Sequence, residues 1–437
     1  MSALKSLFGT VFLFAILAAL GAGGYMLFND TTGPSLTISP NLDRVAPKRE
    51  LTVTVADADS ALRSVRVTAH QEARSVVVVD QAFTPNTTSQ DIVFSLSSAG
   101  IKDGPFVLEI SATDASYGNF MKGNSTTQSY NMNMDSRRPR ITTNTTPPYI
   151  RRGGSGVIAY TVSEDTDKTG IQVGDLFFPA FQQDSGEFVC FFAFPYSMTV
   201  ADFQPELMAQ DLAGNITNTR LAHYPLDKQF KHDKIPLSDA FLNRKMPEFA
   251  DIFDDDMTMD EMFIRVNCDL RQGNVQALMD LASNTSSTMM WKGAFAGLPR
   301  SANRAGFGDH RSYVYRDKVI DEQTHLGLDF ASVAQAPIPA GNAGIILFAG
   351  DLGIYGQLVV IDHGLGLMSL YSHMSEIDVH VGDHVNKGDV LGRTGTTGMA
   401  AGDHLHFGML VGGIEVQPLE WLDGHWIQDN IYGRLKK

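Results

Sequence analysis

The chain has 437 residues, of which 43% are hydrophobic and 19% are charged, a composition typical of folded domains rather than of disorder. This length exceeds that of one ordinary domain, so two to four domains are expected. The formal net charge of −15 argues against nucleic-acid binding, which needs a basic face.

The N-terminal segment is apolar. No charged residue interrupts residues 7–28, which as a helix can span a hydrocarbon core of about 30 Å. Lys5 precedes this run and Asp30 follows it, which favours an N-terminus on the cytoplasmic side. We expect residues 1–30 to form an uncleaved transmembrane signal-anchor, with the rest of the chain in the periplasm. A cleaved signal peptide, with small residues at 21–23, is the alternative.

The segment that follows, residues 31–136, has the pattern of short strands. Apolar and polar residues alternate in 51–55 and 65–67, and β-branched or aromatic residues fill 75–79 and 106–110. Short strands separated by turn residues predict a β-sandwich.

A weak internal repeat indicates a second unit of this kind at residues 137–226. An Asp-containing turn sequence at Asp114 returns near Asp211, about one hundred residues later, and both resemble the turns of bacterial immunoglobulin-like modules. Glycine and asparagine tolerate the positive φ that such turns need, so a turn explains the pattern. A calcium site at Asp114 or Asp211 is the alternative.

Residues 227–302 change in character. A capping pair at Ser238 and Asp239 and helical spacing in 260–266 and 274–281 predict a short helical linker or subdomain. The two cysteines, Cys190 and Cys268, lie at no metal-binding spacing. We expect two buried free thiols, with a single disulfide as the alternative.

Five residues near the C-terminus carry the chemistry of a metal site: His325, Asp329, His373, His404 and His406. Zinc takes nitrogen and oxygen ligands, and a catalytic zinc usually keeps three protein ligands. His404 and His406 are two apart, a spacing that puts both rings on one face of a strand. One of this pair could bind the metal with His325 and Asp329, which leaves His373 and the other to handle protons. The remaining histidines of this region are expected to be packed or exposed side chains: His310, His363, His380, His384 and His425.

Other hydrolytic motifs are missing from the sequence. No Gly-x-Ser-x-Gly elbow supplies a serine nucleophile, and no His-Glu-x-x-His pair supplies a glutamate base. A histidine, which titrates near pH 6.5, must therefore serve as the base or stabilise the oxyanion.

Further motifs surround the five residues in a fixed order, at 325–331, 360–364, 370–374, 381–383, 387–389, 395–398 and 404–408. Over roughly residues 303–424 they resemble the lysostaphin-type, or LytM-domain, zinc endopeptidases. The resemblance implies an antiparallel β peptidase domain at 303–437, one zinc ion held by His325, Asp329 and His406, and catalytic roles for His373 and His404. One departure is Asp403, which stands where the family usually has proline.

The resemblance also implies a function: a membrane-anchored endopeptidase that hydrolyses the peptide cross-links of peptidoglycan in cell-wall remodelling. Peptidoglycan, the inner membrane and other envelope proteins are then the expected partners. The alternative is a catalytically silent regulator or peptidoglycan-binding scaffold that activates another hydrolase. Residues 237–303 are expected either to be a plain linker or to lie in the groove and offer a polar group to the metal.

Overall fold

The computed structural model describes residues 16–17, 30–117, 121–143, 145–253 and 257–435. Strands make up 45% of it and helices 16%, which confirms the prediction of a mainly β protein. Within these ranges, no helix is both long and apolar enough to cross a membrane. The predicted anchor at residues 1–30 lies outside them, except for Ile16, Leu17 and Asp30.

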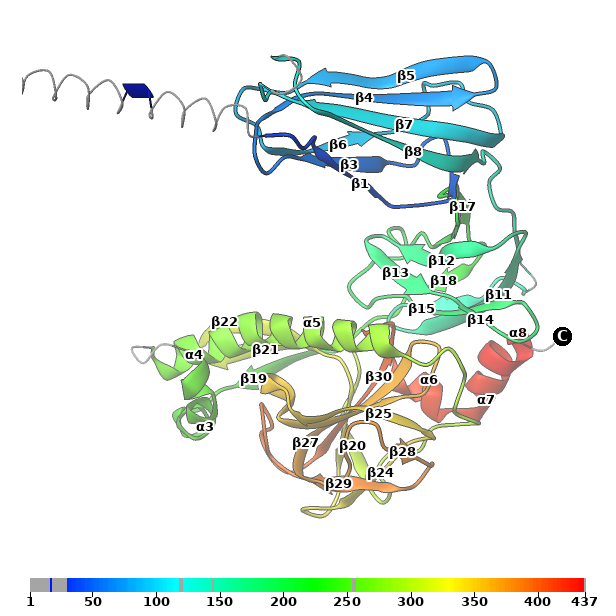
Figure 1. Cartoon of the computed structure of the whole chain (residues 1–437). Helices are drawn as coiled ribbons and strands as arrows, with labels where there is room; N and C mark the ends of the chain where they lie inside the picture. The colour runs from blue at the N-terminus through cyan, green and yellow to red at the C-terminus, as the bar shows by residue number, and fades with distance from the viewer. Residues whose placement is uncertain (1–15, 18–29, 118–120, 144, 254–256, 436–437) are drawn as a thin grey trace, which may run out of the picture. The chain divides into compact units, whose positions relative to one another are not determined.

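The contacts divide the chain into two compact units, and the first consists mainly of residues up to Pro139. Its two sheets are drawn at the upper part of Figure 1. One sheet has the order β1-β3-β6, with β1 Ser35–Ser39, β3 Leu51–Ala56 and β6 Ser89–Phe94. The other has the order β2-β8-β7-β4-β5, with β2 Arg44–Val45, β8 Ser125–Met134, β7 Gly104–Asp114, β4 Leu62–Gln71 and β5 Arg74–Ala82.

One hydrophobic core joins these two sheets. Alternate residues of β3, such as Val53, are buried and pack in the same cluster as Val67 of β4 and Leu108 of β7. Because side chains alternate across a strand, the period-two pattern of the sequence places one apolar face of each sheet inward. The predicted strands are confirmed, and the likeness to immunoglobulin modules stays a prediction.

The second unit begins with the strands of residues 141–226. Two four-stranded sheets have the orders β14-β15-β11-β9 and β13-β12-β16-β17, and β10 pairs with β18. Their bounds are β9 Ile141–Thr143, β10 Tyr149–Arg151, β11 Ser155–Val162, β12 Thr166–Val173, β13 Leu176–Pro179, β14 Phe181–Gln182, β15 Phe188–Ala193, β16 Glu206–Asp211, β17 Ile216–Arg220 and β18 Tyr224–Leu226.

These strands share a core with the C-terminal part of the chain. Phe191 of β15 lies 5.9 Å from Trp421, ring centre to ring centre, and both belong to one buried cluster that also contains Leu405. The sequence indicated separate segments at 137–226 and 303–437, whereas these aromatic contacts pack them into one compact unit. Contacts between residues so far apart in sequence leave no periodic signal.

Residues 239–252 and 259–284 are helical, as predicted. The helices are α3 Asp239–Lys245, η1 Met246–Ile252, α4 Met259–Arg265, η2 Val266–Leu270, α5 Arg271–Leu281 and η3 Ala282–Asn284. Ser238 caps α3, and Thr258 with Glu261 forms a capping box at α4. The region is not only helical, because β19, His232–Pro236, pairs in parallel with β21, Asp309–Tyr315.

The helices cover one face of the C-terminal sheet rather than merely linking two domains. Phe263 and Leu278 are fully buried in a cluster with Val360, Leu370 and Leu410 of the sheet. Burying side chains of this size contributes about 1.5–3 kcal/mol each. A chain that began at residue 303 would expose that face to water.

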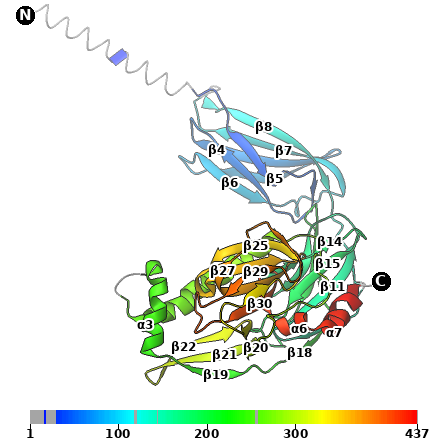
Figure 2. The same ribbon diagram turned by 90° about the horizontal axis from the view of Figure 1, so that it is seen from below.

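The C-terminal part is built on one antiparallel sheet, as predicted. Its main path is β20-β23-β30-β27-β26-β25-β28, while β24, β29 and β31 pair beside it, and Figure 2 shows β25, β27, β29 and β30 together. The bounds are β20 Ala302–Ala305, β22 Lys318–His325, β23 Leu328–Ala331, β24 Pro337–Pro339, β25 Gly344–Asp351, β26 Gln357–Asp362, β27 Leu367–Ile377, β28 His384–Val385, β29 Val390–Thr394, β30 Leu405–Val411 and β31 Ile414–Val416. Short helices close the chain: α6 Pro418–Leu422, α7 Gly424–Ile427, η5 Gln428–Tyr432 and α8 Gly433–Leu435.

The two cysteines are both free. Cys190 is buried on β15, but Cys268 is exposed, so the prediction of two buried thiols is wrong for Cys268. Its neighbours Val266 and Asn267 take the buried positions of η2, which turns the next side chain outward.

Candidate metal centre

Three neighbouring strands bring the predicted ligands to one place. Asp329 on β23 lies directly opposite His406 on β30, and His406 in turn faces Ser372 on β27. His325 is the last residue of β22, three residues before β23 begins. The register of β23 against β30 sets the positions of Asp329 and His406, while His325 is positioned by β22, which pairs with β21 in a separate sheet.

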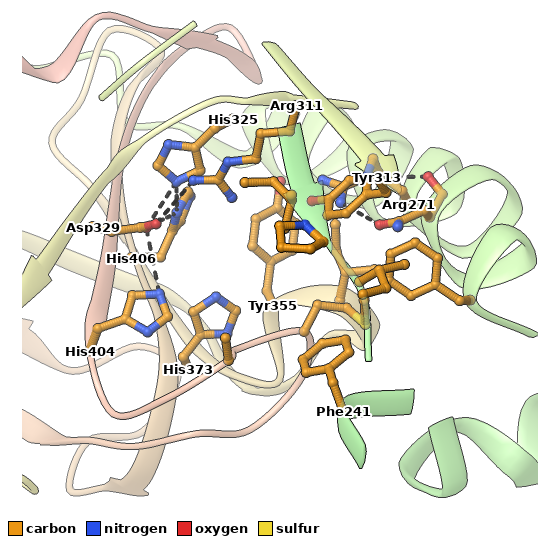
Figure 3. Close-up of a pocket in the computed structure, with 18 residues that line it drawn as sticks. Phe241, Arg271, Arg311, Tyr313, His325, Asp329, Tyr355, His373, His404 and His406 are labelled. Carbon is orange, nitrogen blue, oxygen red and sulfur yellow. Dashed lines mark hydrogen bonds and ion pairs between the residues drawn. The ribbon is translucent and has the colours of Figure 1, made fainter. Parts of the chain in front are cut away.

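The three ligand atoms form a tight triangle. His325 Nε2, Asp329 Oδ1 and His406 Nδ1 lie 2.9 Å from one another. The three side chains meet at the Asp329 carboxylate in Figure 3. Gly327 makes this approach possible, because a Cβ atom there would lie 2.5 Å from the His406 ring.

The hydrogen bond of His325 to the backbone indicates that a cation fits between the three ligand atoms. His325 Nδ1 lies 2.8 Å from the carbonyl oxygen of Gly306, a contact that needs a proton on Nδ1. A neutral His325 then directs the lone pair of its Nε2 at the Asp329 oxygen, so two electron-rich atoms face each other. A divalent metal satisfies both, and the spacing is close to the roughly 3.3 Å between ligand atoms of a tetrahedral zinc site.

His373 and His404 stand beside the triangle without joining it. Each is fixed from behind, because His373 Nδ1 bonds the Thr397 carbonyl oxygen at 2.9 Å and His404 Nδ1 bonds that of Gly402 at 2.8 Å. Their rings are 4.8 Å apart, and His404 Nε2 lies 3.6 Å from Asp329 Oδ1. Because Nδ1 of each ring is occupied, Nε2 is the nitrogen that can take part in proton transfer in the cavity.

The backbone at His373 supports a functional role. Its φ of +62° is in the left-handed region, which a residue other than glycine enters at a cost. Such strain persists only where the surrounding structure imposes it, and it gathers at functional sites.

The charges of the site suit metal binding. Burial alone would raise the pKa of Asp329, but the close imidazoles of His325, His404 and His406 hold the pKa well below its usual range. Burial lowers the pKa of His406 to about 4, and burial followed by the neighbouring His404 keeps the pKa of His373 well below its usual value. Near neutral pH Asp329 is therefore a carboxylate and His406 and His373 are neutral, the forms in which such groups bind divalent metals.

The pKa of His404 moves the other way. Burial lowers it, but the hydrogen bond and the attraction to Asp329 outweigh burial and raise it. The two flanking histidines therefore differ in their affinity for a proton.

Residues 323–418 match the model of peptidase family M23. This part of the chain is an M23 domain. The match confirms the lysostaphin-type resemblance of the sequence and covers all five residues of the site.

Known proteins resemble the M23 domain over the same stretch. The DD-carboxypeptidase/endopeptidase Mpg of Neisseria meningitidis is 38% identical over 95 residues, and the peptidoglycan DD-endopeptidase ShyA of Vibrio cholerae is 34% identical over 96. Each match covers 22% of this chain and 22% of the relative, so the likeness spans about a fifth of the curated relatives. A solved structure of a Pseudomonas aeruginosa protein assigned to peptidase M23 aligns with a TM-score of 0.39 and 20% identity, over 62% of this chain and 94% of its own.

A cavity of about 380 Å³ opens from the histidines of the M23 domain. Figure 3 shows Phe241, Tyr313 and Tyr355 lining it across from the three ligands. The segment expected at 237–303 therefore reaches the groove, with apolar side chains such as Leu237 and Phe241 and with the polar Asn267 and Arg271. No residue of that segment belongs to a metal-binding group within the described residues, so its inhibitory role stays a prediction.

Two residues near the ligands carry no signal in the sequence. Arg311 Nη2 donates to Asp329 Oδ2 at 3.3 Å, and Tyr355 donates to the buried Glu415 at 3.1 Å. Arg311 reaches the site only because β21 pairs with β22, which ends at His325. Only a correct prediction that β21 pairs with β22 would have placed Arg311 at the site.

His363 is a structural histidine, as expected. It is fully buried, and its ring nitrogens lie 2.7 Å from the Ala343 carbonyl oxygen and 2.7 Å from Ser369 Oγ. Burial lowers the pKa of His363 to about 4, so the ring stays neutral inside the sheet.

Proposed function

We propose that the chain is a zinc metalloendopeptidase that hydrolyses the peptide cross-links of peptidoglycan. The observation that carries this proposal is the triangle of His325, Asp329 and His406 beside the two oriented imidazoles of His373 and His404. Relatives of the M23 domain are named as peptidoglycan endopeptidases, which supports the choice of substrate.

His325, Asp329 and His406 would hold the zinc ion. When bound, zinc supplies Lewis acidity, which lowers the pKa of a water and polarises the scissile carbonyl. Arg311 holds the second oxygen of Asp329, so that Oδ1 stays turned toward the two histidines.

The protein's own acid–base groups would be His373 and His404. With Nδ1 of each ring tied to a backbone carbonyl, Nε2 of each faces the cavity and can take or give a proton. General acid–base catalysis of this kind typically contributes 10²–10⁴-fold to a rate. The aromatic walls at Phe241 and Tyr313 would exclude water and hold the peptide in the groove.

The direct test is digestion of purified peptidoglycan by the full chain, with mass spectrometry of the released muropeptides. We expect cross-linked dimers to fall and monomers to rise, with the glycan strands intact. A zinc chelator should stop the reaction, and added zinc should restore it. Unchanged dimers in the presence of one bound zinc would contradict the enzyme and favour a regulator or scaffold.

We further propose that the chain is anchored in the cytoplasmic membrane, with both compact units in the periplasm. The uninterrupted apolar run at residues 7–28 supports this location. A reporter fused after Asp30 should be exported and stay in the membrane fraction. A soluble and shortened periplasmic product would instead indicate a cleaved signal peptide.

A further inference from the structure

A second group of acidic side chains lies in the first unit, apart from the M23 domain. Asp30, Asp57 and Asp114 each offer a carboxylate oxygen, and these oxygens all lie within 4.8 Å of one another. The sheet topology brings them together. Asp57 directly follows β3, whose last residue Ala56 pairs with the first residue of β1, and Asp114 is the last residue of β7.

Two of these side chains are buried, and the carboxylates of Asp30 and Asp57 are incompletely paired. Asp57 is 7% exposed and Asp114 is 0% exposed. Asp57 Oδ2 and Asp30 Oδ2 are inaccessible atoms without any hydrogen-bond partner. A buried carboxylate oxygen without a donor carries a large desolvation cost, so an unpartnered pair in one place indicates a missing positive partner.

No basic side chain supplies that charge. Among the described residues, none of the three carboxylates forms an ion pair with lysine or arginine. The donors that do reach them are neutral: Asp57 Oδ1 accepts from the backbone of Asp59 at 3.0 Å and of Ser60 at 2.7 Å. Asp114 Oδ1 accepts from the backbone of Ser116 at 3.0 Å and of Asn124 at 2.8 Å, and its Oδ2 accepts from Asn124 Nδ2 at 3.0 Å, so both of its oxygens have partners. Asp30 Oδ1 accepts from the backbone of Thr32 at 3.2 Å. These bonds orient the carboxylates but leave about three negative charges together.

The related turn at Asp211 shows what a turn alone requires. Asp211 Oδ1 accepts from the backbone of Gly214 and Asn215, both at 2.8 Å, and Oδ2 accepts from Asn215 Nδ2 at 2.9 Å. Both oxygens are satisfied, and Asp211 belongs to no acidic group among the described residues. Turn chemistry therefore accounts for Asp211 but does not account for Asp30 and Asp57.

We propose that Asp30, Asp57 and Asp114 bind a calcium ion. Three carboxylates provide hard oxygen donors and a charge that exceeds that of the ion, which suits calcium. Calcium also accepts irregular coordination by six to eight oxygens, whereas magnesium demands a near-ideal octahedron. The ion would fasten Asp30, which directly follows the apolar N-terminal segment in sequence, to the ends of β3 and β7.

The test is calcium titration of the full, zinc-loaded chain by calorimetry, after removal of calcium with EGTA. We expect one calcium ion per chain, with a Kd of about 1 mM or tighter. Asp57→Asn should weaken binding by about tenfold or more, because it removes a ligand charge and leaves the Oδ1 acceptor in place. The matched control is Asp43→Asn, since Asp43 is exposed between β1 and β2 and lies outside the group, and it should bind calcium within about threefold of wild type.

Thermal unfolding supplies a second measurement that does not depend on calorimetric heat. Without calcium, Asp57→Asn should unfold at the wild-type temperature or above, because it removes a buried charge. Saturating calcium should raise the Tm of wild type and of Asp43→Asn, with a much smaller rise for Asp57→Asn. The proposal fails if wild type neither binds calcium nor gains Tm, if Asp43→Asn loses as much as Asp57→Asn, or if magnesium binds as tightly.

Discussion

Replacing His325, Asp329 or His406 with alanine is expected to abolish zinc retention and, with it, peptidoglycan hydrolysis. Each residue supplies one of three atoms that lie 2.9 Å apart, and two ligands do not hold a catalytic zinc in a cavity open to solvent. We expect about one zinc per wild-type chain after dialysis and close to none in each variant, measured by elemental analysis.

His384→Ala is the matched control for this experiment, because His384 is exposed on β28 and outside the site. It should retain zinc and activity in full. Circular dichroism separates loss of the metal from loss of the fold. Zinc content equal to wild type in all three ligand variants would show that the metal is held elsewhere.

Replacing His373 or His404 with alanine should leave zinc bound and still lower kcat by about 10²–10⁴-fold. The reason is that neither ring belongs to the three-atom group, while both rings line the cavity with Nδ1 tied to a backbone carbonyl. Zinc content and turnover of cross-linked muropeptide dimers are measured on the same samples.

The control here is His425→Ala, an exposed histidine at the start of α7. Its turnover should match wild type. The assignment of a histidine as catalytic would be overturned if its alanine variant kept near-wild-type kcat with zinc bound. A variant that lost zinc as well would belong with the ligands instead.

The features that the sequence predicted correctly share a local cause. Alternation at Leu51–Val55 reports which face of its strand is buried, and the β-branched run at 75–79 favours an extended backbone; both are strands in the structure. The His-x-His spacing likewise depends only on the two-residue period of β30. Periodicity of this kind depends only on neighbouring residues and can therefore be read from the sequence alone.

The features that it missed depend on contacts between distant segments. Arg311 beside Asp329 and the wall formed by Phe241 result from strand pairing and helix packing that no periodic pattern encodes. The strand at His232–Pro236 was hidden for the same reason, since each of its residues pairs with one 78 residues further on. Cys268 was misjudged because a π-helical turn changes which residues face inward.

The packing of the helices of residues 239–284 on the sheet bears on how such a protein can be recombined in evolution or in the laboratory. The stretch that is recognisable as an M23 domain begins at residue 323, yet Phe263 and Leu278 are buried against Val360, Leu370 and Leu410 within it. A chimaera joined ahead of β19 would transfer the sheet together with the helices that pack on it. A chimaera joined at residue 303 would transfer the sheet without these helices, so that its apolar face would contact an unrelated protein segment or water. The segment that can be exchanged between proteins is therefore longer than residues 323–418, which match the family.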